Sequence, residues 1–217
     1  MTNDGAPVEE RLLKHMTDQI AHRGPDGDGY FNGGDIALGH RRLSIIDIDG
    51  GKQPMYCEKK EIILSYNGEI YNYQALRREL EGLGHRFKTA SDTEVVLMSY
   101  KQWGETCVER LRGMFAFAVW DSQKQTLFIA RDRVGIKPLY YSFLPSGDFV
   151  FASELKAVLA HPHLPRVLRL DALEDYLTLG YVPDPKTILE HVHKLPPATT
   201  LTLKKGSKAP TMRVYWT

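Results

Sequence analysis

Apolar residues recur at helical spacing near the beginning of the chain. Between Val8 and Ile20, five apolar residues follow a helical repeat, with charged residues between them. This pattern predicts an amphipathic helix over residues 8–21. Residues 23–29 hold three glycines and one proline, so we expect the helix to give way to a turn there.

Start and stop signals predict further helices. Asn72 can cap a helix over residues 73–83, and Gly84 can end it. Ser91 and Glu94 have the spacing of a capping box in front of an apolar segment, so we expect another helix to begin there. Two shorter helices are predicted downstream, at residues 154–160 and 171–179.

Apolar segments bounded by turn residues predict strands at residues 36–46, 61–66, 114–120, 126–130, 139–141, 149–151 and 199–203. Several of these strands carry apolar residues on both faces, a pattern typical of sheets that are covered on both sides. Two antiparallel sheets stacked on each other, with helices outside, would explain this pattern. The chain is therefore predicted to be a layered α+β domain.

The composition is that of an ordinary packed domain. Of the 217 residues, 42% are hydrophobic and 25% are charged, which excludes a disordered tail, a collagen-like fibre and a small disulfide scaffold. Lysine and arginine number 28 against 27 aspartates and glutamates, so no nucleic acid partner is expected. The longest apolar run, residues 114–120, is far too short to span a bilayer. Since no secretory leader is recognisable, we expect a cytoplasmic location without membrane contact.

Two cysteines, Cys57 and Cys107, lie 50 positions apart without any C-x-x-C pair. Their spacing predicts neither a metal site nor a disulfide framework. We expect both to be small buried apolar side chains.

Polar segments that interrupt apolar strands are candidates for chemistry, because burying an unused polar group is costly. The first such segment contains the adjacent residues Arg41 and Arg42. Neighbouring strand residues point to opposite faces, so only one of the two can enter a given cavity. An inward arginine would bind a carboxylate with its forked guanidinium, and an arginine that reaches solvent at the strand end is the alternative.

The second polar segment is Asn67-Gly68-Glu69, at the end of a predicted strand. An asparagine amide beside a glycine N–H can donate two hydrogen bonds to one developing oxyanion, whereas an ordinary Asn-Gly turn is the plainer interpretation. A third candidate is Asp92, which either assists a helix cap or holds a ligand ammonium group. Together these groups describe a pocket for an amino acid whose side-chain carbonyl is attacked.

Seven short motifs occur in an order that resembles the glutaminase domain of glutamine-hydrolysing asparagine synthetases. The resemblance covers the chain from Asp4 to Trp216, and the ordered set is far more specific than any single motif. The motifs are HRGPDG at 22–27, RLSIID at 42–47, NGEIYN at 67–72, SDTEV at 91–95, RGMFA at 112–116, RDRVGIKPLY at 131–140 and FASELK at 151–156.

This resemblance implies a class II glutamine amidotransferase domain of the N-terminal-nucleophile (Ntn) type, folded as a four-layer αββα sandwich of two stacked antiparallel sheets. In that family a cysteine at the mature N-terminus attacks the glutamine amide, and its own α-amino group acts as the base. The released ammonia travels to an ATP-dependent synthetase domain that activates aspartate for amidation. ATP and Mg²⁺ are expected only in that second domain, so neither a cofactor nor a metal is expected in this one.

The resemblance also implies a division of the chain and a set of partners. Residues 1–190 are expected to form the amidotransferase domain, and residues 191–217 an extension leading toward the synthetase domain. That synthetase domain would act in cis or in trans. L-glutamine is the implied substrate, and a homodimer is a further expectation.

Each glutamine contact is carried over from a matching motif. Arg42 would bind the α-carboxylate of glutamine, and Asp92 its α-ammonium group. Asn67 and Gly68 would form the oxyanion hole, while Glu69 would line the amino-acid end. The neighbouring residues of the second motif are expected to complete the glutamine site, namely Leu43, Ser44, Ile45 and Ile46.

The chain departs from the family at the position of the nucleophile. The family opens with Met-Cys-Gly-Ile and a short apolar strand, whereas here Met1-Thr2-Asn3 precedes the first matching segment. Neither Cys57 nor Cys107 can replace the nucleophile, because the chemistry needs a free α-amine on the same residue. Thr2 could serve as an N-terminal nucleophile only if a strand carried it into the cleft.

Two expectations follow from this departure. The first strand of the sandwich is expected to be missing from this sequence, which should leave unpaired backbone groups and a groove. The chain as written is expected not to hydrolyse glutamine. A non-catalytic module that binds glutamine or a protein partner is the alternative function.

Overall fold

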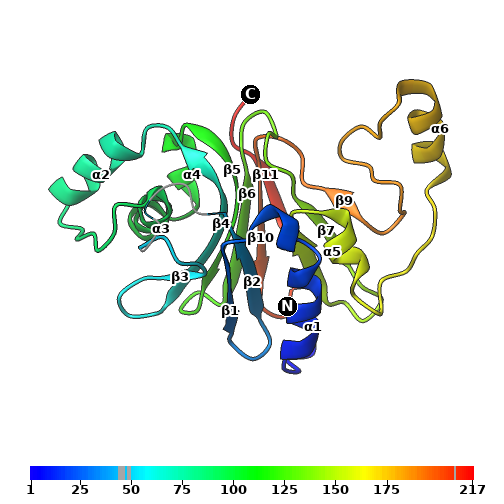
Figure 1. The fold of residues 1–217 in the computed structure, drawn as a ribbon, viewed down its shortest axis with the longest axis horizontal. Coiled ribbons are helices and arrows are strands. Elements are labelled where there is room, and N and C mark those ends of the chain that lie inside the picture. Colours follow the sequence, from blue (N-terminus) through cyan, green and yellow to red (C-terminus); the bar gives the residue numbers. More distant parts are fainter. Residues whose placement is uncertain (44–46, 48–49, 208) are drawn as a thin grey trace.

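The computed structural model describes residues 1–43, 47, 50–207 and 209–217, and it shows two layers of strands stacked between helices (Figure 1). One layer is a six-stranded antiparallel sheet with the strand order β11-β10-β6-β5-β4-β3. Its strands are β3 (Met55–Tyr56), β4 (Ile62–Ile70), β5 (Gly113–Asp121), β6 (Thr126–Arg131), β10 (Thr199–Lys204) and β11 (Thr211–Val214).

The second layer consists of two smaller antiparallel pieces. One is a hairpin of β1 (Gly27–Asn32) and β2 (Ala37–Arg42), and the other has the order β8-β7-β9. The latter strands are β7 (Tyr140–Phe143), β8 (Phe149–Ala152) and β9 (His193–Lys194). A single apolar cluster contains Leu38 of β2, Phe149 of β8 and Ile129 of β6. Both pieces therefore pack on the same face of the six-stranded sheet.

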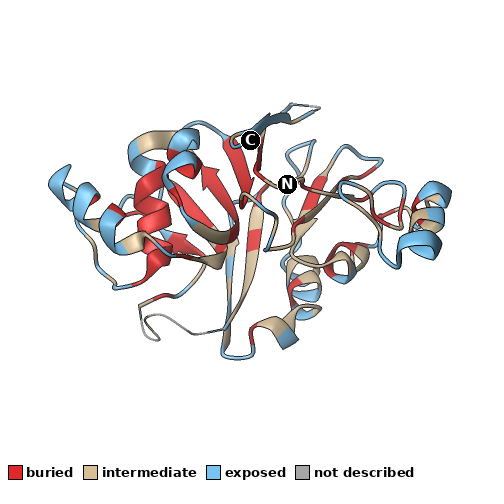
Figure 2. Ribbon diagram, turned by 90° about the horizontal axis from the view of Figure 1, so that it is seen from above, coloured by how far each residue is buried: buried red, intermediate tan, exposed pale blue. Residues whose placement is uncertain are grey.

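Helices cover both outer faces of the strand layers (Figure 1). On the side of the six-stranded sheet lie α2 (Tyr73–Gly82), α3 (Asp92–Trp103) and α4 (Cys107–Arg110), and on the opposite side lie α1 (Glu10–Asp18) and α5 (Leu155–Leu159). Two short 3-10 turns occur at Ala21–Arg23 and Gly104–Thr106. The helix α6 (Leu170–Leu179) stands away from the sandwich at one end and is largely exposed (Figure 2). By contrast, α3 is buried continuously over its first nine residues.

This arrangement confirms the predicted α+β sandwich of stacked antiparallel layers. The strands expected at residues 114–120 and 126–130 are present as the antiparallel neighbours β5 and β6, and the helices expected after Asn72 and Ser91 are present as α2 and α3. Three strands, β9, β10 and β11, come from residues 191–217, the segment expected to be an extension. Within the structure β10 pairs with β6 in the six-stranded sheet.

Several local expectations are wrong. The glycine-rich segment expected to be a turn instead contains β1, where a Cβ atom on Gly29 would overlap the carbonyl oxygen of Gln53. Asn67-Gly68-Glu69 does not follow a strand but lies inside β4, which continues to Ile70 opposite Gly113 of β5. The strands β9 and β11 were not expected, because one has two residues and the other is exposed throughout.

The capping box expected before α3 is only half formed. The Ser91 hydroxyl accepts a hydrogen bond from the backbone N–H of Thr93, at 3.2 Å, so it does cap the helix. The Glu94 carboxylate does not return to Ser91. It accepts from the backbone N–H groups of Lys88 and Thr89 instead, and so fastens the preceding loop to the helix.

The two pieces of the second layer meet along a seam that Met1 and Thr2 enter. The Met1 amine donates to the Phe149 carbonyl, and the Phe149 N–H donates to the Met1 carbonyl, both at 2.9 Å. On the other side, the Thr2 N–H donates at 2.8 Å to the carbonyl of Asp35, just before β2. These two residues therefore connect both pieces as a strand would. Among the strands that the structure describes, β2 pairs with β1 alone and β8 with β7 alone.

No helix in the described part of the chain has the length and apolar character needed to cross a membrane.

A buried carboxylate holds the loop that follows β6. Asp132 is 0% exposed, and its two oxygens accept backbone hydrogen bonds from Phe115, Val134, Ile136 and Lys137. We predict that Asp132→Ala lowers the free energy of unfolding by about 3 kcal/mol or more, because several buried donors lose their acceptor. Urea unfolding measures this change. The matched variant Asp171→Ala removes an exposed carboxylate and should cost less than about 1 kcal/mol; equal losses would contradict the prediction.

Candidate active site

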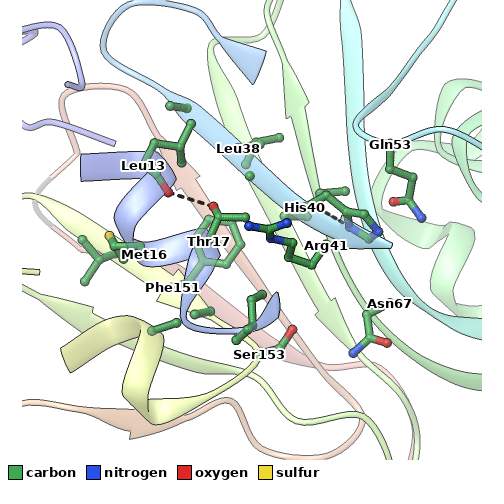
Figure 3. Close-up of a pocket in the computed structure, with 18 of the residues that line it drawn as sticks. Leu13, Met16, Thr17, Leu38, His40, Arg41, Gln53, Asn67, Phe151 and Ser153 are labelled. Carbon is green, nitrogen blue, oxygen red and sulfur yellow. Dashed lines mark hydrogen bonds between the residues drawn. The ribbon is translucent and has the colours of Figure 1, made fainter. Parts of the chain in front are cut away.

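A cavity of about 1240 Å³ occupies the seam between β2 and β8 and reaches β4 and β5 of the larger sheet. In Figure 3, Leu13, Met16 and Thr17 of α1 form part of its wall, together with His40 and Asn67 from the strand layers. Ligand pockets generally measure about 300–1,000 Å³, so this cavity has room for an amino acid. The groove expected from the sequence is present at this seam.

Most of the residues expected to bind glutamine line this one cavity. They are Arg42, Leu43, Asn67, Gly68, Glu69 and Asp92. Three others, Ser44, Ile45 and Ile46, lie outside the described residues. The fold thus brings together side chains from β2, β4 and the first turn of α3, which are separated by up to 50 positions in the sequence.

The free edge of β4 gives the site its backbone donor. The Tyr66 N–H donates at 2.6 Å to the side-chain oxygen of Gln53, and the Ile70 N–H donates at 3.0 Å to the Asp92 carboxylate. Alternate residues of a strand direct their N–H groups to the same side, so the Gly68 N–H points to this edge as well. Its neighbour across the ladder, Phe115, exchanges its backbone hydrogen bonds with Asp132 instead.

The Gly68 N–H is therefore a backbone donor on the cavity wall. It lies between the N–H groups of Tyr66 and Ile70, which already donate to side chains. Among the described residues, the Gly68 N–H makes no backbone hydrogen bond outside the strand ladder. A Cβ atom at this position would overlap the carbonyl oxygen of Met114 and lie 2.8 Å from the Cα of Phe115. Glycine is the residue that the crowded backbone permits here, and its small size leaves the N–H accessible to a ligand.

Asn67 provides a second donor next to this one. Its side-chain nitrogen is buried and has no hydrogen-bond partner within the described part of the chain. A buried amide left without a partner costs about 1–3 kcal/mol, which is typical of a group that a ligand or a water completes. Asn67 and Gly68 together can donate two hydrogen bonds to one carbonyl oxygen, as an oxyanion hole does.

Asp92 does not cap α3, although it is the first residue of that helix. It is 4% exposed, and one of its oxygens, Oδ2, accepts from the Tyr66 hydroxyl at 2.7 Å and from the Ile70 N–H at 3.0 Å. Because Ser91 already caps the helix, the Asp92 carboxylate is available to the cavity that it lines.

Arg42 ends β2 and lines the same cavity. Its guanidinium donates to the backbone carbonyl of Asp47 at 2.6 Å and lies against the backbone of Gly51. The Asp47 carboxylate accepts from the N–H groups of Gly50 and Ala90, which holds the pKa of Asp47 below its usual value. The position of Arg42 is thus linked to the loop that precedes α3.

Neither cysteine lies in the cavity wall. Cys57 and Cys107 are both buried and free, and both belong to the apolar cluster beneath α3. Burial raises the pKa of the Cys107 thiol far above its ordinary value. A thiol of this kind is an inert structural group rather than a nucleophile.

Thr2 also lines the cavity. It is hydrogen-bonded beside Asp35, seven positions from Arg42 along an extended segment, which corresponds to about 23 Å. Its hydroxyl donates to the carbonyl of Ala6 at 2.5 Å. Thr2 is therefore not placed to attack a carbonyl held at Asn67 and Gly68.

Three residues of the site were missed by the sequence analysis, namely His40, Gln53 and Tyr66. His40 lies two positions before Arg42, so both side chains lie on the same face of β2. This spacing could have identified His40 from the sequence. Gln53 and Tyr66 meet through a contact between the loop before β3 and the middle of β4. No local sequence pattern indicates that contact.

His40 is a half-buried neutral base in the cavity wall. One ring nitrogen lies 3.3 Å from the hydroxyl of Ser65. Burial, with a smaller effect of the nearby Arg42 charge, lowers the pKa of His40 to about 4. The imidazole therefore stays uncharged at neutral pH.

This low pKa predicts a loss of stability in mild acid. Between about pH 6.5 and pH 4 the unfolded chain binds a proton at His40 and the folded chain does not, so stability falls as the pH falls through this range. From pH 7 to pH 5, the unaltered chain should lose about 2 kcal/mol more than His40→Gln. Urea unfolding at both pH values measures this difference. The exposed-site variant His15→Gln should behave like the unaltered chain, and an equal loss in His40→Gln would refute the account.

Comparisons with known proteins agree with this geometry. The profile of a family described as "Glutamine amidotransferase domain" matches residues 2–216. Asparagine synthetase [glutamine-hydrolyzing] 3 of Bacillus subtilis (strain 168) is 43% identical over 200 residues, which are 91% of this chain and 32% of that protein. Asparagine synthetase B of Escherichia coli (strain K12) is 46% identical over 155 residues, which are 71% of this chain and 28% of that protein.

Solved structures confirm the fold. Glutamine phosphoribosylpyrophosphate amidotransferase from B. subtilis, complexed with ADP and GMP, superposes with a TM-score of 0.68 at 19% identity. The superposition covers 97% of this chain and 48% of that one. This chain spans about a third of the length of the curated relatives that it matches. The chain belongs to the glutamine amidotransferase domain family, in the form that glutamine-hydrolysing asparagine synthetases contain.

Proposed function

We propose that the cavity binds L-glutamine and that this domain releases ammonia from its side-chain amide, as the glutaminase part of an asparagine synthetase. The observation that carries the proposal is the donor pair of Asn67 and Gly68, one with a buried unpaired nitrogen and the other on an open strand edge. Two such donors match the carbonyl oxygen of an amide under attack.

The charged residues of the cavity suit the other end of glutamine. Asp92 would bind the α-ammonium group through Oδ1, since the Tyr66 hydroxyl and the Ile70 N–H both donate to Oδ2. Arg42 would bind the α-carboxylate, for which a guanidinium is the best-matched side chain. Glu69, on the same wall, would line the amino-acid end. In this arrangement the binding residues fix the substrate while the oxyanion donors face its amide.

The reaction needs a thiol nucleophile, and neither Cys57 nor Cys107 lies in the cavity wall. In the proposed chemistry a thiolate attacks the amide carbon, the C–N bond breaks as the nitrogen is protonated, and ammonia leaves. Water then releases glutamate from the thioester. The α-amine of the cysteine itself would take the thiol proton and deliver it to the leaving nitrogen.

A strand that bears this cysteine would fit into the seam between β2 and β8. Met1 and Thr2 already bond to Phe149 on one side and Asp35 on the other. In an antiparallel pair, each residue of one strand lies opposite one residue of the other. A strand that continues for about six residues before Met1 would therefore extend to the level of Arg42. A nucleophile at that point would lie beside the donor pair on β4.

The whole protein would couple this domain to an ATP-dependent synthetase half that amidates aspartate, in cis or in trans. The support is the length of the relatives and their names, which describe glutamine-hydrolysing asparagine synthetases. ATP and Mg²⁺ would bind in that half, and residues 191–217, whose strand β10 belongs to the six-stranded sheet, would lead toward it. A cytoplasmic location, where ATP is supplied, and a homodimer are parts of the same proposal.

The proposal predicts that a suitable N-terminal strand makes the chain active. A six-residue apolar extension that begins with a free cysteine should allow the chain to convert glutamine into glutamate and ammonia. The matched extension that begins with serine should bind glutamine but release at least a hundredfold less ammonia, because it lacks the thiol. Enzymatic detection of glutamate and ammonia measures both.

Asn67→Ala in the cysteine-extended chain provides the internal control. Losing one oxyanion donor should lower kcat by about 10²–10³-fold, with a smaller effect on KM. Glutamine binding without any ammonia release by the cysteine-extended chain would favour the non-catalytic module. The absence of glutamine binding at millimolar concentration would reject the site itself.

A further inference from the structure

Tyr66 links the two parts of the cavity that the proposed function uses. Its ring is 3% exposed and packs in the apolar cluster beneath α3. Its backbone accepts and donates hydrogen bonds with the side-chain amide of Gln53, at 2.9 and 2.6 Å. Its hydroxyl donates at 2.7 Å to Oδ2 of Asp92. Tyr66 therefore lies on the strand that carries Gly68 and also contacts the carboxylate of Asp92 on α3.

The Tyr66 hydroxyl orients the Asp92 carboxylate. Oδ2 receives two donors, the Tyr66 hydroxyl and the Ile70 N–H, from different positions along β4. Two bonds to the same oxygen fix the plane of the carboxylate as well as its location. The other oxygen, Oδ1, takes part in neither bond, and Asp92 lines the cavity.

The hydroxyl stays a donor under all ordinary conditions. Burial, reinforced by the Asp92 charge, raises the pKa of Tyr66 well above its ordinary value. The phenol is therefore protonated at neutral pH, and its hydrogen is directed to a carboxylate, the stronger kind of acceptor.

We propose that Tyr66 is a positioning residue that sets the affinity of the site for the α-ammonium group of its amino-acid ligand, by holding Asp92 in place. The inference rests on the proposed function, in which Asp92 receives that ammonium. It identifies the α-amino group as the part of the ligand that Tyr66 controls, through Asp92 and without touching the ligand.

Removing the hydroxyl should leave the rest of the site unchanged. In Tyr66→Phe the ring still fills its place under α3, and Gln53 still holds the backbone at this position. The ladder partner of Tyr66 is Phe117 of β5, and that pairing does not involve the hydroxyl. The variant therefore separates the hold on Asp92 from the position of Gly68.

Calorimetric titration of the 217-residue chain with two ligands tests the proposal. The ligands are L-glutamine and glutaramate, which is glutamine without its α-amino group. Tyr66→Phe should weaken L-glutamine binding about tenfold, as expected for losing a hydrogen bond to a charged group, and should change glutaramate binding less than twofold. A general loss of structure would weaken the binding of both ligands.

Two further variants complete the test. Tyr215→Phe removes a half-buried tyrosine hydroxyl, which donates to the backbone carbonyl of Arg131, and should leave both affinities unchanged. Asp92→Asn should abolish the preference for L-glutamine over glutaramate even in the presence of Tyr66.

The outcomes separate the inference from the function on which it rests. Equal weakening of both ligands by Tyr66→Phe, or no weakening of either, would overturn the role of Tyr66. No glutamine binding by the unaltered chain, or an undiminished preference in Asp92→Asn, would overturn the proposed function and the inference together. A selective loss for L-glutamine in Tyr66→Phe, with no change in Tyr215→Phe, would support both.

Discussion

The edge of β4 between Tyr66 and Ile70 is the constraint on which the rest of the site depends. Three successive N–H groups point out of this edge, and two of them are already occupied, by Gln53 and by Asp92. Among the described residues, the N–H of Gly68 between them is left for a ligand, and the crowding by Met114 and Phe115 requires glycine there. Because a strand directs alternate N–H groups to one side, the position of this donor is fixed by the sheet and not by a mobile loop.

Two buried carboxylates fasten the surrounding elements to β4 and to its neighbour β5. Asp132 accepts a hydrogen bond from the N–H of Phe115, the ladder neighbour of Gly68. It also accepts from N–H groups of the loop after β6. Asp92 joins the start of α3 to the end of β4. Buried charges are tolerated when several donors satisfy them, and here the donors belong to the segments that shape the cavity. The bonds that compensate for burial also position the site.

The sequence predicted the layers and most helices, and residues that it singled out line one cavity, but it did not predict how they are brought together. Arg42, Asn67, Gly68 and Asp92 were identified from motifs, and the cavity contains all four. The Asn-Gly pair suggested a turn because local propensity cannot reveal that β5 pairs along the whole of β4. Tyr66 was missed for a similar reason. Its partner Asp92 is 26 positions away, and only the packing of α3 on the sheet brings the two together.

The central claim is that the Gly68 N–H and the Asn67 amide meet the side-chain carbonyl of glutamine. The most direct measurement is the NMR titration of the ¹⁵N-labelled chain with L-glutamine, following the Gly68 backbone amide and the Asn67 side-chain amide. The account predicts that both signals shift and saturate with one common dissociation constant, while L-glutamine leaves amides remote from the cavity, such as those of α6, unchanged. Saturable binding that moves neither signal would contradict it.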